Sequence, residues 1–448
     1  MILWFGEALL PDGWAKRVRV TVSGGRIMAV VRDSEPGSTD ERHAVGLPGM
    51  GNVHSHAFQR GMAGLSEQRG APDDDFWSWR EVMYRFLDRL DPPAIEAIAA
   101  LAYAEMLESG YTHVGEFHYL HHDPAGHPYA ALATTAQSIV AAADTTGIGL
   151  TLLPVFYAHA DFGGMPAKPG QRRFVCDLDG FARLFESCRT VLRPGDRIGL
   201  APHSLRAVTP DELAVLLPLA GEGPVHIHAA EQTKEVDDCV AALGARPVEW
   251  LLANAPVDAR WCLVHATHLS PAETDALAAS GAVAGLCPMT EANLGDGTFP
   301  AVRYLAGGGR IGTGTDSNIL VDAAAELRHL EYSQRLLHRG RNLLASDDYP
   351  SVGRRLFDAA LDGGARALGV GSGIAPGCSA DIITLATQHP SFAAASGDGV
   401  LDRWIFASRG QAIDAVWRSG QRVVSNGRHH ARDAIERAYR AAIIAVLG

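Results

Sequence analysis

Apolar residues along the chain fall into short runs that alternate with longer segments of helical spacing. Such runs, bounded by turn residues, are typical of strands buried in a parallel sheet. Eight of them follow one another, the first around Val53 and the others at 112–117, 150–156, 198–202, 225–228, 262–265, 283–286 and 311–315. Helical patterns lie between most of them, and the clearest covers 92–109, where Gly110 provides a stop.

This alternation predicts an α/β fold, a TIM-like (β/α)8 barrel whose active site lies at the carboxyl ends of the strands. The alternative is an open doubly wound sheet. That fold usually carries a glycine fingerprint for a dinucleotide, and here Gly312 and Gly314 have no third glycine at the required offset. A phosphate loop ending in G-K-[ST] is also missing.

The two ends of the chain have a different pattern. Val18, Val20 and Val22 alternate with polar residues, and short strand-like runs return near 377–385, 412–417 and 422–424. We therefore expect both termini to form one small β-sandwich, in residues 1–48 and 376–448, flanking a catalytic barrel in residues 49–375. The last segment, 431–446, has apolar residues at helical spacing and predicts a packed amphipathic helix.

Composition and charge argue against several classes of protein. The 448 residues carry a net charge of −12, which disfavours nucleic-acid binding. No apolar run approaches the roughly 18 residues that a membrane helix needs, and the start has no signal-peptide pattern, so we expect no membrane association and a cytoplasmic location. Six scattered cysteines without a C-x-x-C pair predict neither a disulfide framework nor a thiolate zinc site.

Histidines and an aspartate stand at the ends of four predicted strands. His54 and His56 share one face of the first strand, an arrangement that taken alone is more often an ordinary pair of histidines. His228, His265 and Asp316 stand at the ends of three further strands. Three imidazoles and one carboxylate from this set can bind one divalent metal, leaving a position for water and one histidine to act on it.

At these residues the chain resembles the amidohydrolase superfamily over nearly its full length. Glu231, three residues after His228, matches the deaminase branch. The resemblance implies that His265 contacts the bound water or the leaving group and that Glu231 shuttles protons, with Asp316 also accepting the water proton. It also implies a set of metal ligands, namely His54, His56, His228 and Asp316.

The predicted centre holds one metal. Two-metal members of the superfamily carry a carboxylated lysine after strand 4, and no lysine stands there in this chain, since Lys168 lies in a Pro/Gly loop and Lys234 follows Glu231. Zinc is favoured by the ligand types, and iron occupies similar sites.

Other polar residues near the strand ends favour an anionic substrate: Gln59, Arg80, Tyr119, His203 and Arg206. Guanidinium groups pair with carboxylates in a bidentate manner. The alternative for each arginine is an ordinary local salt bridge, and a nucleobase pocket would more naturally be lined by aromatic and amide side chains.

Six segments also resemble the formimidoylglutamate deiminase family of histidine degradation: 51–61, 76–84, 116–122, 201–208, 226–233 and 286–295. The resemblance implies hydrolysis of N-formimidoyl-L-glutamate to N-formyl-L-glutamate and ammonia, substrate contacts from the five polar residues above, and a homodimer. Two alternatives stay open. One is another mononuclear deaminase or hydrolase acting on a purine or triazine, and the other is a catalytically silent barrel used as a scaffold.

Overall fold

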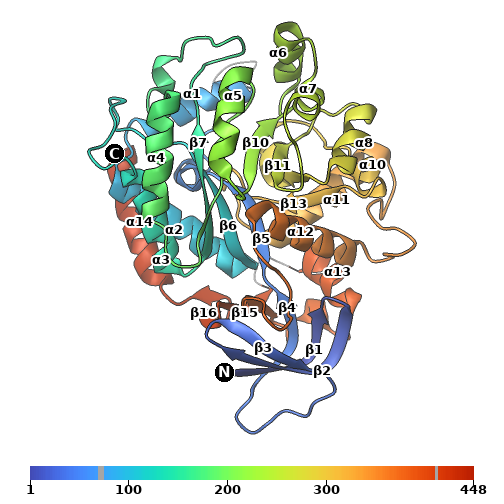
Figure 1. Cartoon of the computed structure of the whole chain (residues 1–448). Helices are drawn as coiled ribbons and strands as arrows, with labels where there is room; N and C mark the ends of the chain where they lie inside the picture. The colour runs from blue at the N-terminus through green and yellow to red at the C-terminus, as the bar shows by residue number, and fades with distance from the viewer. Residues whose placement is uncertain (69–74, 409–411) are drawn as a thin grey trace.

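The computed structural model describes residues 1–68, 75–408 and 412–448, and its main body is a barrel of parallel strands (Figure 1). The sheet runs β10-β11-β12-β13-β5-β6-β7-β8, with β9 paired to β7. Parallel bridges from Leu200 to Val225 and from Ser204 to His228 join its two ends and close the ring. The barrel strands are β5 (Met50–Ser55), β6 (Tyr111–His118), β7 (Gly149–Phe156), β8 (Arg197–Ile198), β9 (Ala201–Pro202), β10 (Val225–Ala229), β11 (Trp261–His265), β12 (Val283–Leu286) and β13 (Arg310–Thr313).

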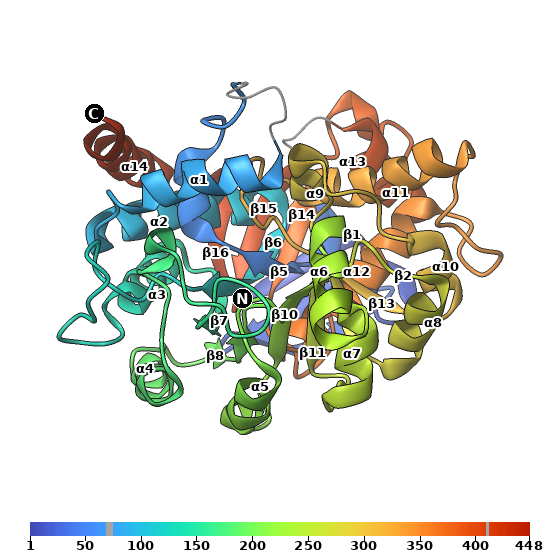
Figure 2. The ribbon, with the colours of Figure 1, turned by 90° about the horizontal axis from the view of Figure 1, so that it is seen from above.

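The predicted (β/α)8 barrel is therefore confirmed, and the doubly wound alternative is wrong. Every residue of β6, β7 and β10 is buried, which explains their nearly continuous apolar runs. Seen from above, helices surround the strands (Figure 2). The helices of this part are α1 (Phe76–Leu87), α2 (Pro92–Ser109), α3 (Thr134–Thr146), α4 (Leu178–Thr190), α5 (Pro210–Leu216), α6 (Thr233–Leu243), α7 (Pro247–Asn254), α8 (Pro271–Ser280), α9 (Pro288–Leu294), α10 (Ala301–Ala306), α11 (Ala323–His338) and α12 (Val352–Leu368), with the 3-10 segments η1 (Ala57–Met62), η2 (Pro169–Gln171) and η3 (Leu217–Ala220).

Helix α2 has the bounds that the sequence predicts. Asp91 caps its start by accepting a hydrogen bond from the Ala94 amide, and Pro92 occupies the first turn, where no intrahelical donor is needed. Gly110 ends it with a left-handed φ of 109°. The chain then enters β6 directly.

Both termini build the second sheet, which lies below the barrel in Figure 1. Its order is β17-β16-β15-β14-β4-β1-β2-β3, so strands from the two ends of the chain meet where β14 pairs with β4. A bridge from Arg26 to Ser379 brings edge strand β3 back to the segment before β14. The strands are β1 (Ile2–Leu10), β2 (Gly13–Ser23), β3 (Arg26–Val31), β4 (Glu41–Pro48), β14 (Ile382–Leu385), β15 (Ile413–Arg418), β16 (Gln421–Ser425) and β17 (Arg428–His429).

The expected small β unit from both termini is thus present, as one curved sheet around its own apolar core. Sequence reasoning missed β1 and β4 as strands. Three more elements complete the chain: η4 (Pro390–Phe392), α13 (Asp398–Ala407) and α14 (Arg432–Leu447). The predicted last helix corresponds to α14, which packs on α2, where Arg432 pairs with Glu105 and Glu108. Among the described residues, no helix is both long and apolar enough to cross a membrane.

Candidate metal centre and active site

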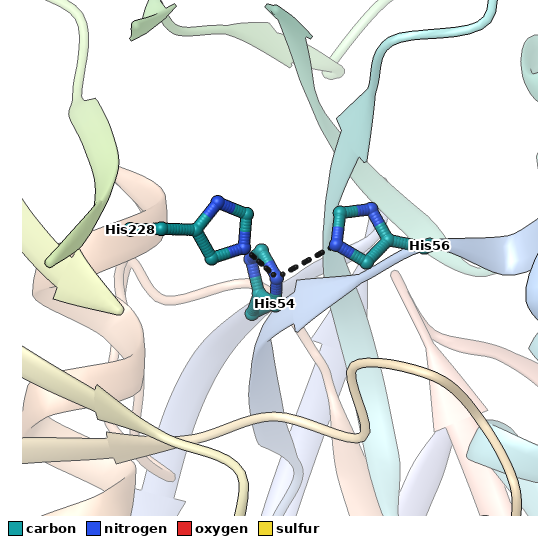
Figure 3. A group of neighbouring side chains, drawn as sticks. All are labelled: His54, His56 and His228. Atoms are coloured by element: carbon teal, nitrogen blue, oxygen red, sulfur yellow. Dashed lines mark hydrogen bonds between the residues drawn. The ribbon is translucent and has the colours of Figure 1, made fainter. Parts of the chain in front are cut away.

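Three histidines converge at the carboxyl end of the barrel (Figure 3). His54 lies on β5, His56 follows that strand, and His228 lies on β10. The His54 Nε2 atom is 3.2 Å from His56 Nε2 and 3.1 Å from His228 Nε2. The three rings therefore direct the same nitrogen toward a common point.

Backbone carbonyls fix the orientation of two of these rings. His56 Nδ1 donates to the Phe117 carbonyl over 3.0 Å, and His228 Nδ1 donates to the His203 carbonyl over 3.1 Å. Burial lowers the pKa of all three imidazoles, that of His56 to about 3. Neutral rings with their Nε2 lone pairs facing one another are what a bound cation requires, so these residues fit a divalent metal.

Asp316 supplies a negative charge to the same point. Its Oδ1 atom is 3.4 Å from His54 Nε2 and 3.3 Å from His56 Nε2. Burial opposes this charge, but the imidazoles of His54, His56 and His265 around the carboxylate hold the pKa of Asp316 well below its ordinary value. Two backbone hydrogen bonds of 2.9 Å, from Asp316 N to the His54 carbonyl and from His56 N to the Asp316 carbonyl, tie this residue to the first strand.

The loop around Asp316 has a strained backbone. Asp316 and Asn318 have φ values of 44° and 54°, in the left-handed region that side chains disfavour. The buried Asn318 amide offsets this strain by donating to the Ser55 hydroxyl and to the carbonyls of His56 and Asp316. Asn318 thus holds Asp316 against strand β5, which carries His54 and leads into His56.

His265 and Glu231 lie beside this centre. His265 Nε2 is 3.6 Å from Glu231 Oε1 and 3.9 Å from Asp316 Oδ2. Burial raises the pKa of Glu231, which favours the protonated form of this carboxyl group beside the metal-binding residues. Burial opposes a charge on His265, but Glu231 and two further carboxylates raise the pKa of that imidazole to about 10.

Sequence reasoning missed Glu291 as part of this arrangement. Its Oε1 atom is 3.3 Å from His265 Nδ1 and accepts a 2.8 Å hydrogen bond from the Cys287 amide. This carboxylate orients the His265 ring through the nitrogen that points away from Glu231. The signal that could have revealed it is its place just after the seventh predicted strand.

The five predicted substrate-binding residues all line one cavity above the three histidines, together with His56, His228, Glu231, His265 and Asp316. His54 is fully buried beneath it. The cavity also has an apolar and aromatic lining that was not predicted: Phe76, Trp79, Met83, Tyr84, Tyr157, Phe174 and Leu294.

The two arginines differ in how they are held. Arg80 donates to the hydroxyls of Tyr84 and Tyr157, over 2.7 and 3.3 Å, and no carboxylate among the described residues lies within ion-pairing distance of it. Arg206 is buried, with Nη2 3.7 Å from Glu231 and Nε 4.0 Å from Glu235. An ordinary local salt bridge therefore accounts for Arg206 only in part, because its carboxylate contacts are long. It does not account for Arg80, which has no carboxylate partner among the described residues.

The neutral polar residues of the cavity are also in place. Gln59 donates to the Tyr119 hydroxyl over 2.9 Å, and its own Oε1 atom is buried without a partner among the described residues. Burial and the nearby arginines keep the pKa of His203 well below its ordinary value, so this ring is neutral. A polar ligand in the cavity could therefore donate a hydrogen bond to the Gln59 Oε1 atom.

Comparisons with known proteins give family matches over most of the chain. The model of the Amidohydrolase family matches residues 45–423, and the model described as "Formimidoylglutamate deiminase HutF, N-terminal domain" matches residues 2–44. The chain is 52% identical over 438 residues to a formimidoylglutamate deiminase of Pseudomonas aeruginosa, covering 97% of this chain and 96% of that protein.

Two solved structures extend the comparison. The crystal structure of an amidohydrolase from Brucella melitensis is 54% identical, with a TM-score of 0.96 and full coverage of both chains. A zinc-bound adenosine deaminase from Xanthomonas campestris is 22% identical, with a TM-score of 0.81 and coverage of 100% and 98%. The second likeness concerns the fold alone.

Proposed function

This chain belongs to the amidohydrolase family, and we propose that it hydrolyses N-formimidoyl-L-glutamate to N-formyl-L-glutamate and ammonia, a step of histidine degradation. One observation carries the proposal: a cluster of metal-binding character and two arginines line a single cavity. Such a cavity suits a substrate with a hydrolysable amidine at one end and carboxylates at the other.

We assign one divalent metal to His54, His56, His228 and Asp316, and zinc is the ion we propose because imidazole and carboxylate ligands suit it. When bound, such a metal lowers the pKa of a coordinated water to about 7 and so supplies a nucleophile at neutral pH. Elemental analysis of the purified protein tests the assignment, with iron as the competing result.

The protein's own groups move the protons. Glu231 takes a proton from the water that attacks the formimidoyl carbon and delivers it to the imino nitrogen, with Asp316 as a second acceptor. His265 donates to the oxygen on which negative charge develops. As Glu231 and Asp316 pass the second proton of the water to the same nitrogen, the bond between carbon and that nitrogen breaks, ammonia leaves, and the N-formyl product keeps the oxygen of the water.

Arg80 and Arg206 would hold the substrate's carboxylates, because they provide the positive charge of the cavity and guanidinium forks match carboxylates in geometry. The unpartnered Gln59 oxygen, the Tyr119 hydroxyl and the neutral His203 ring are available for the polar groups between the two ends. With its carboxylates bound by the two arginines, the substrate would have its amidine beside Glu231.

The test is a product assay. Purified protein given N-formimidoyl-L-glutamate should release ammonia and N-formyl-L-glutamate in equal amounts. Release of formamide and glutamate would instead overturn the deiminase assignment, because it requires cleavage of the other carbon–nitrogen bond. No turnover by metal-loaded protein would support the silent scaffold.

The aromatic lining of the cavity favours a second candidate, deamination of a ring amidine such as a purine. Activity on guanine or adenosine-type compounds with none on acidic amidines would select it. Arg80 argues against this candidate, since a neutral base would leave the charge of this half-buried arginine without a carboxylate partner among the described residues.

The family resemblance also leads us to propose a homodimer in the cytoplasm. Light scattering coupled to size-exclusion chromatography measures the first, and fractionation of the source cells measures the second. A monomer with full activity would remove any role for the second subunit.

A further inference from the structure

A tryptophan that does not line the cavity stands behind its two arginines. The Arg80 ζ-carbon lies 5.3 Å from the centroid of the Trp77 ring, and the Arg206 ζ-carbon lies 5.7 Å from it. Both are within the range in which a guanidinium is attracted to an indole face. Arg80 comes from α1 and Arg206 from the segment after β9, so Trp77 links two parts of the cavity that are distant in sequence.

Trp77 matters more for Arg206 than for Arg80. Arg80 is also held by two tyrosine hydroxyls. The Nε atom of Arg206 is buried without a hydrogen-bond partner among the described residues. The carboxylates nearest to the guanidinium are Glu231, 3.7 Å from Nη2, and Glu235, 4.0 Å from Nε. The indole is therefore a principal contact that sets where the Arg206 guanidinium lies.

The contact with the ring also affects which part of each arginine remains available. A guanidinium that lies against an aromatic ring keeps its N–H edge free, and that edge carries the donors that match a carboxylate. Two guanidiniums against one rigid ring are held at a defined separation despite the repulsion between like charges. The separation of two carboxylates in a bound ligand should match it.

We propose that Trp77 is a positioning residue that fixes the spacing of Arg80 and Arg206, and that this spacing selects a dicarboxylate with the chain length of glutamate. The inference rests on the proposed function, because it assigns the carboxylates of that substrate to these arginines. It assigns no contact between Trp77 and the substrate.

The chain provides a matched control at the same ring. Lys234 Nζ lies 5.9 Å from the Trp77 centroid, but this ammonium pairs with Asp238 and its side chain is 57% exposed. Lys234→Gln removes a positive charge from the indole without touching either arginine. If the general charge around Trp77 were what mattered, this variant would behave like a Trp77 variant.

The experiment measures dicarboxylate binding by calorimetry with succinate, glutarate and adipate. Wild-type protein should bind glutarate most tightly. Trp77→Leu should weaken glutarate by about 10-fold or more and remove the preference for its length, because two cation–π contacts are lost. Trp77→Phe should restore much of the preference, and Lys234→Gln should keep the wild-type order.

Turnover provides an independent readout. With N-formimidoyl-L-glutamate, Trp77→Leu should raise KM by about 10-fold or more, while kcat at saturation changes by no more than about 3-fold, because no reacting group is altered. Equal weakening of all three dicarboxylates, or a fall in kcat at unchanged KM, would overturn the inference. If Trp77→Leu does not fold, Trp77→Met replaces it as the variant without an aromatic ring, and a full wild-type length preference there would equally reject a role for the ring.

Calorimetry and turnover kinetics together distinguish a failure of this inference from a failure of the proposed function. Calorimetry needs no turnover, so a Trp77-dependent length preference stands even if the wild-type protein fails the product assay. Conversely, a wild-type protein that passes the product assay but shows no length preference rejects the role of Trp77 alone.

Discussion

The floor and the wall of the cavity are built in different ways. The floor, His54, His56, His228 and Asp316, lies on or beside barrel strands and is oriented by backbone carbonyls and backbone hydrogen bonds. The wall consists of Arg80 and Arg206, which reach the cavity from α1 and from a loop and are held by aromatic rings, hydroxyls and distant carboxylates.

This difference separates two tasks. A floor built from the strands of the barrel needs only the fold to form, so it suits the hydrolytic step that members of a superfamily can share. A wall built from loop and helix side chains can change without altering the barrel, so it suits the choice of substrate. Substitutions on the two sides should therefore change different measured quantities.

The largest effect should come from Glu231 at the border between floor and wall. Glu231→Gln keeps the shape of the side chain but cannot accept a proton, so kcat should fall by about 100- to 10,000-fold. Metal content and the KM of the residual activity should stay close to wild type. Initial-rate kinetics with elemental analysis measure both, and full activity in this variant would remove Glu231 from the proposed proton transfer.

The second effect concerns the floor itself. His228→Ala removes one of three converging imidazoles, and the affinity for the metal should fall by at least about 100-fold, beyond the loss caused by outer partners. The measurement is metal content after dialysis against a weak chelator. His226→Gln on the same strand is the control, because His226 Nε2 contacts the Ala367 carbonyl, 2.7 Å away. Equal metal loss in both variants would reject the ligand assignment.

The floor could be predicted from sequence because the barrel brings strand ends together. Each of its residues follows an apolar run at the position where a parallel strand meets the active-site face. Glu291 was missed although it stands just after the seventh predicted strand, since that position alone does not indicate that α9 turns its carboxylate back toward His265. Local patterns identify strands, but a contact from a helix depends on tertiary packing.

The wall shows the limit of sequence reasoning more clearly. Arg80 and Arg206 were selected because guanidinium groups suit carboxylates, yet nothing in the sequence indicates that Trp77 contacts both. The aromatic lining was also missed, because α1 was not predicted as a helix that places successive rings over the strands. In the terminal sheet, β4 was missed, and its partner β14 lies far along the chain; β1 was missed although it pairs with the neighbouring β2.

A third prediction tests the wall. Arg80→Met preserves much of the side-chain volume but loses the charge, and KM should rise by about 10- to 150-fold, because a hydrogen bond to a charged group is worth about 1.5–3 kcal/mol. Metal content should not change, in contrast to His228→Ala. Arg303→Met is the control, since Arg303 is an exposed arginine paired with Asp275. A loss of metal in the Arg80 variant would show that floor and wall are not independent.

The smallest effect concerns a group that supports the floor without touching the metal ligands. Glu116, at the end region of β6, accepts a 2.7 Å hydrogen bond from the Ala57 amide and a 3.0 Å hydrogen bond from Tyr103. Burial raises its pKa to about 8, from an ordinary 4.5. Between these two values the folded protein keeps a proton that the unfolded chain loses, so the stabilisation is complete at low pH and is lost as the pH rises through about 8.

Glu116→Gln mimics the protonated acid and has no such loss. The melting temperature of the variant relative to wild type should therefore increase with pH, by about 2–5 °C between pH 5 and pH 9 for a chain of this size. Glu186→Gln, at a glutamate whose side chain is 66% exposed, should give a constant difference over the same range. KM should stay unchanged in both variants, because neither Glu116 nor Glu186 lines the cavity. A pH-independent difference for Glu116→Gln would mean that this carboxyl group is already ionised in the folded protein.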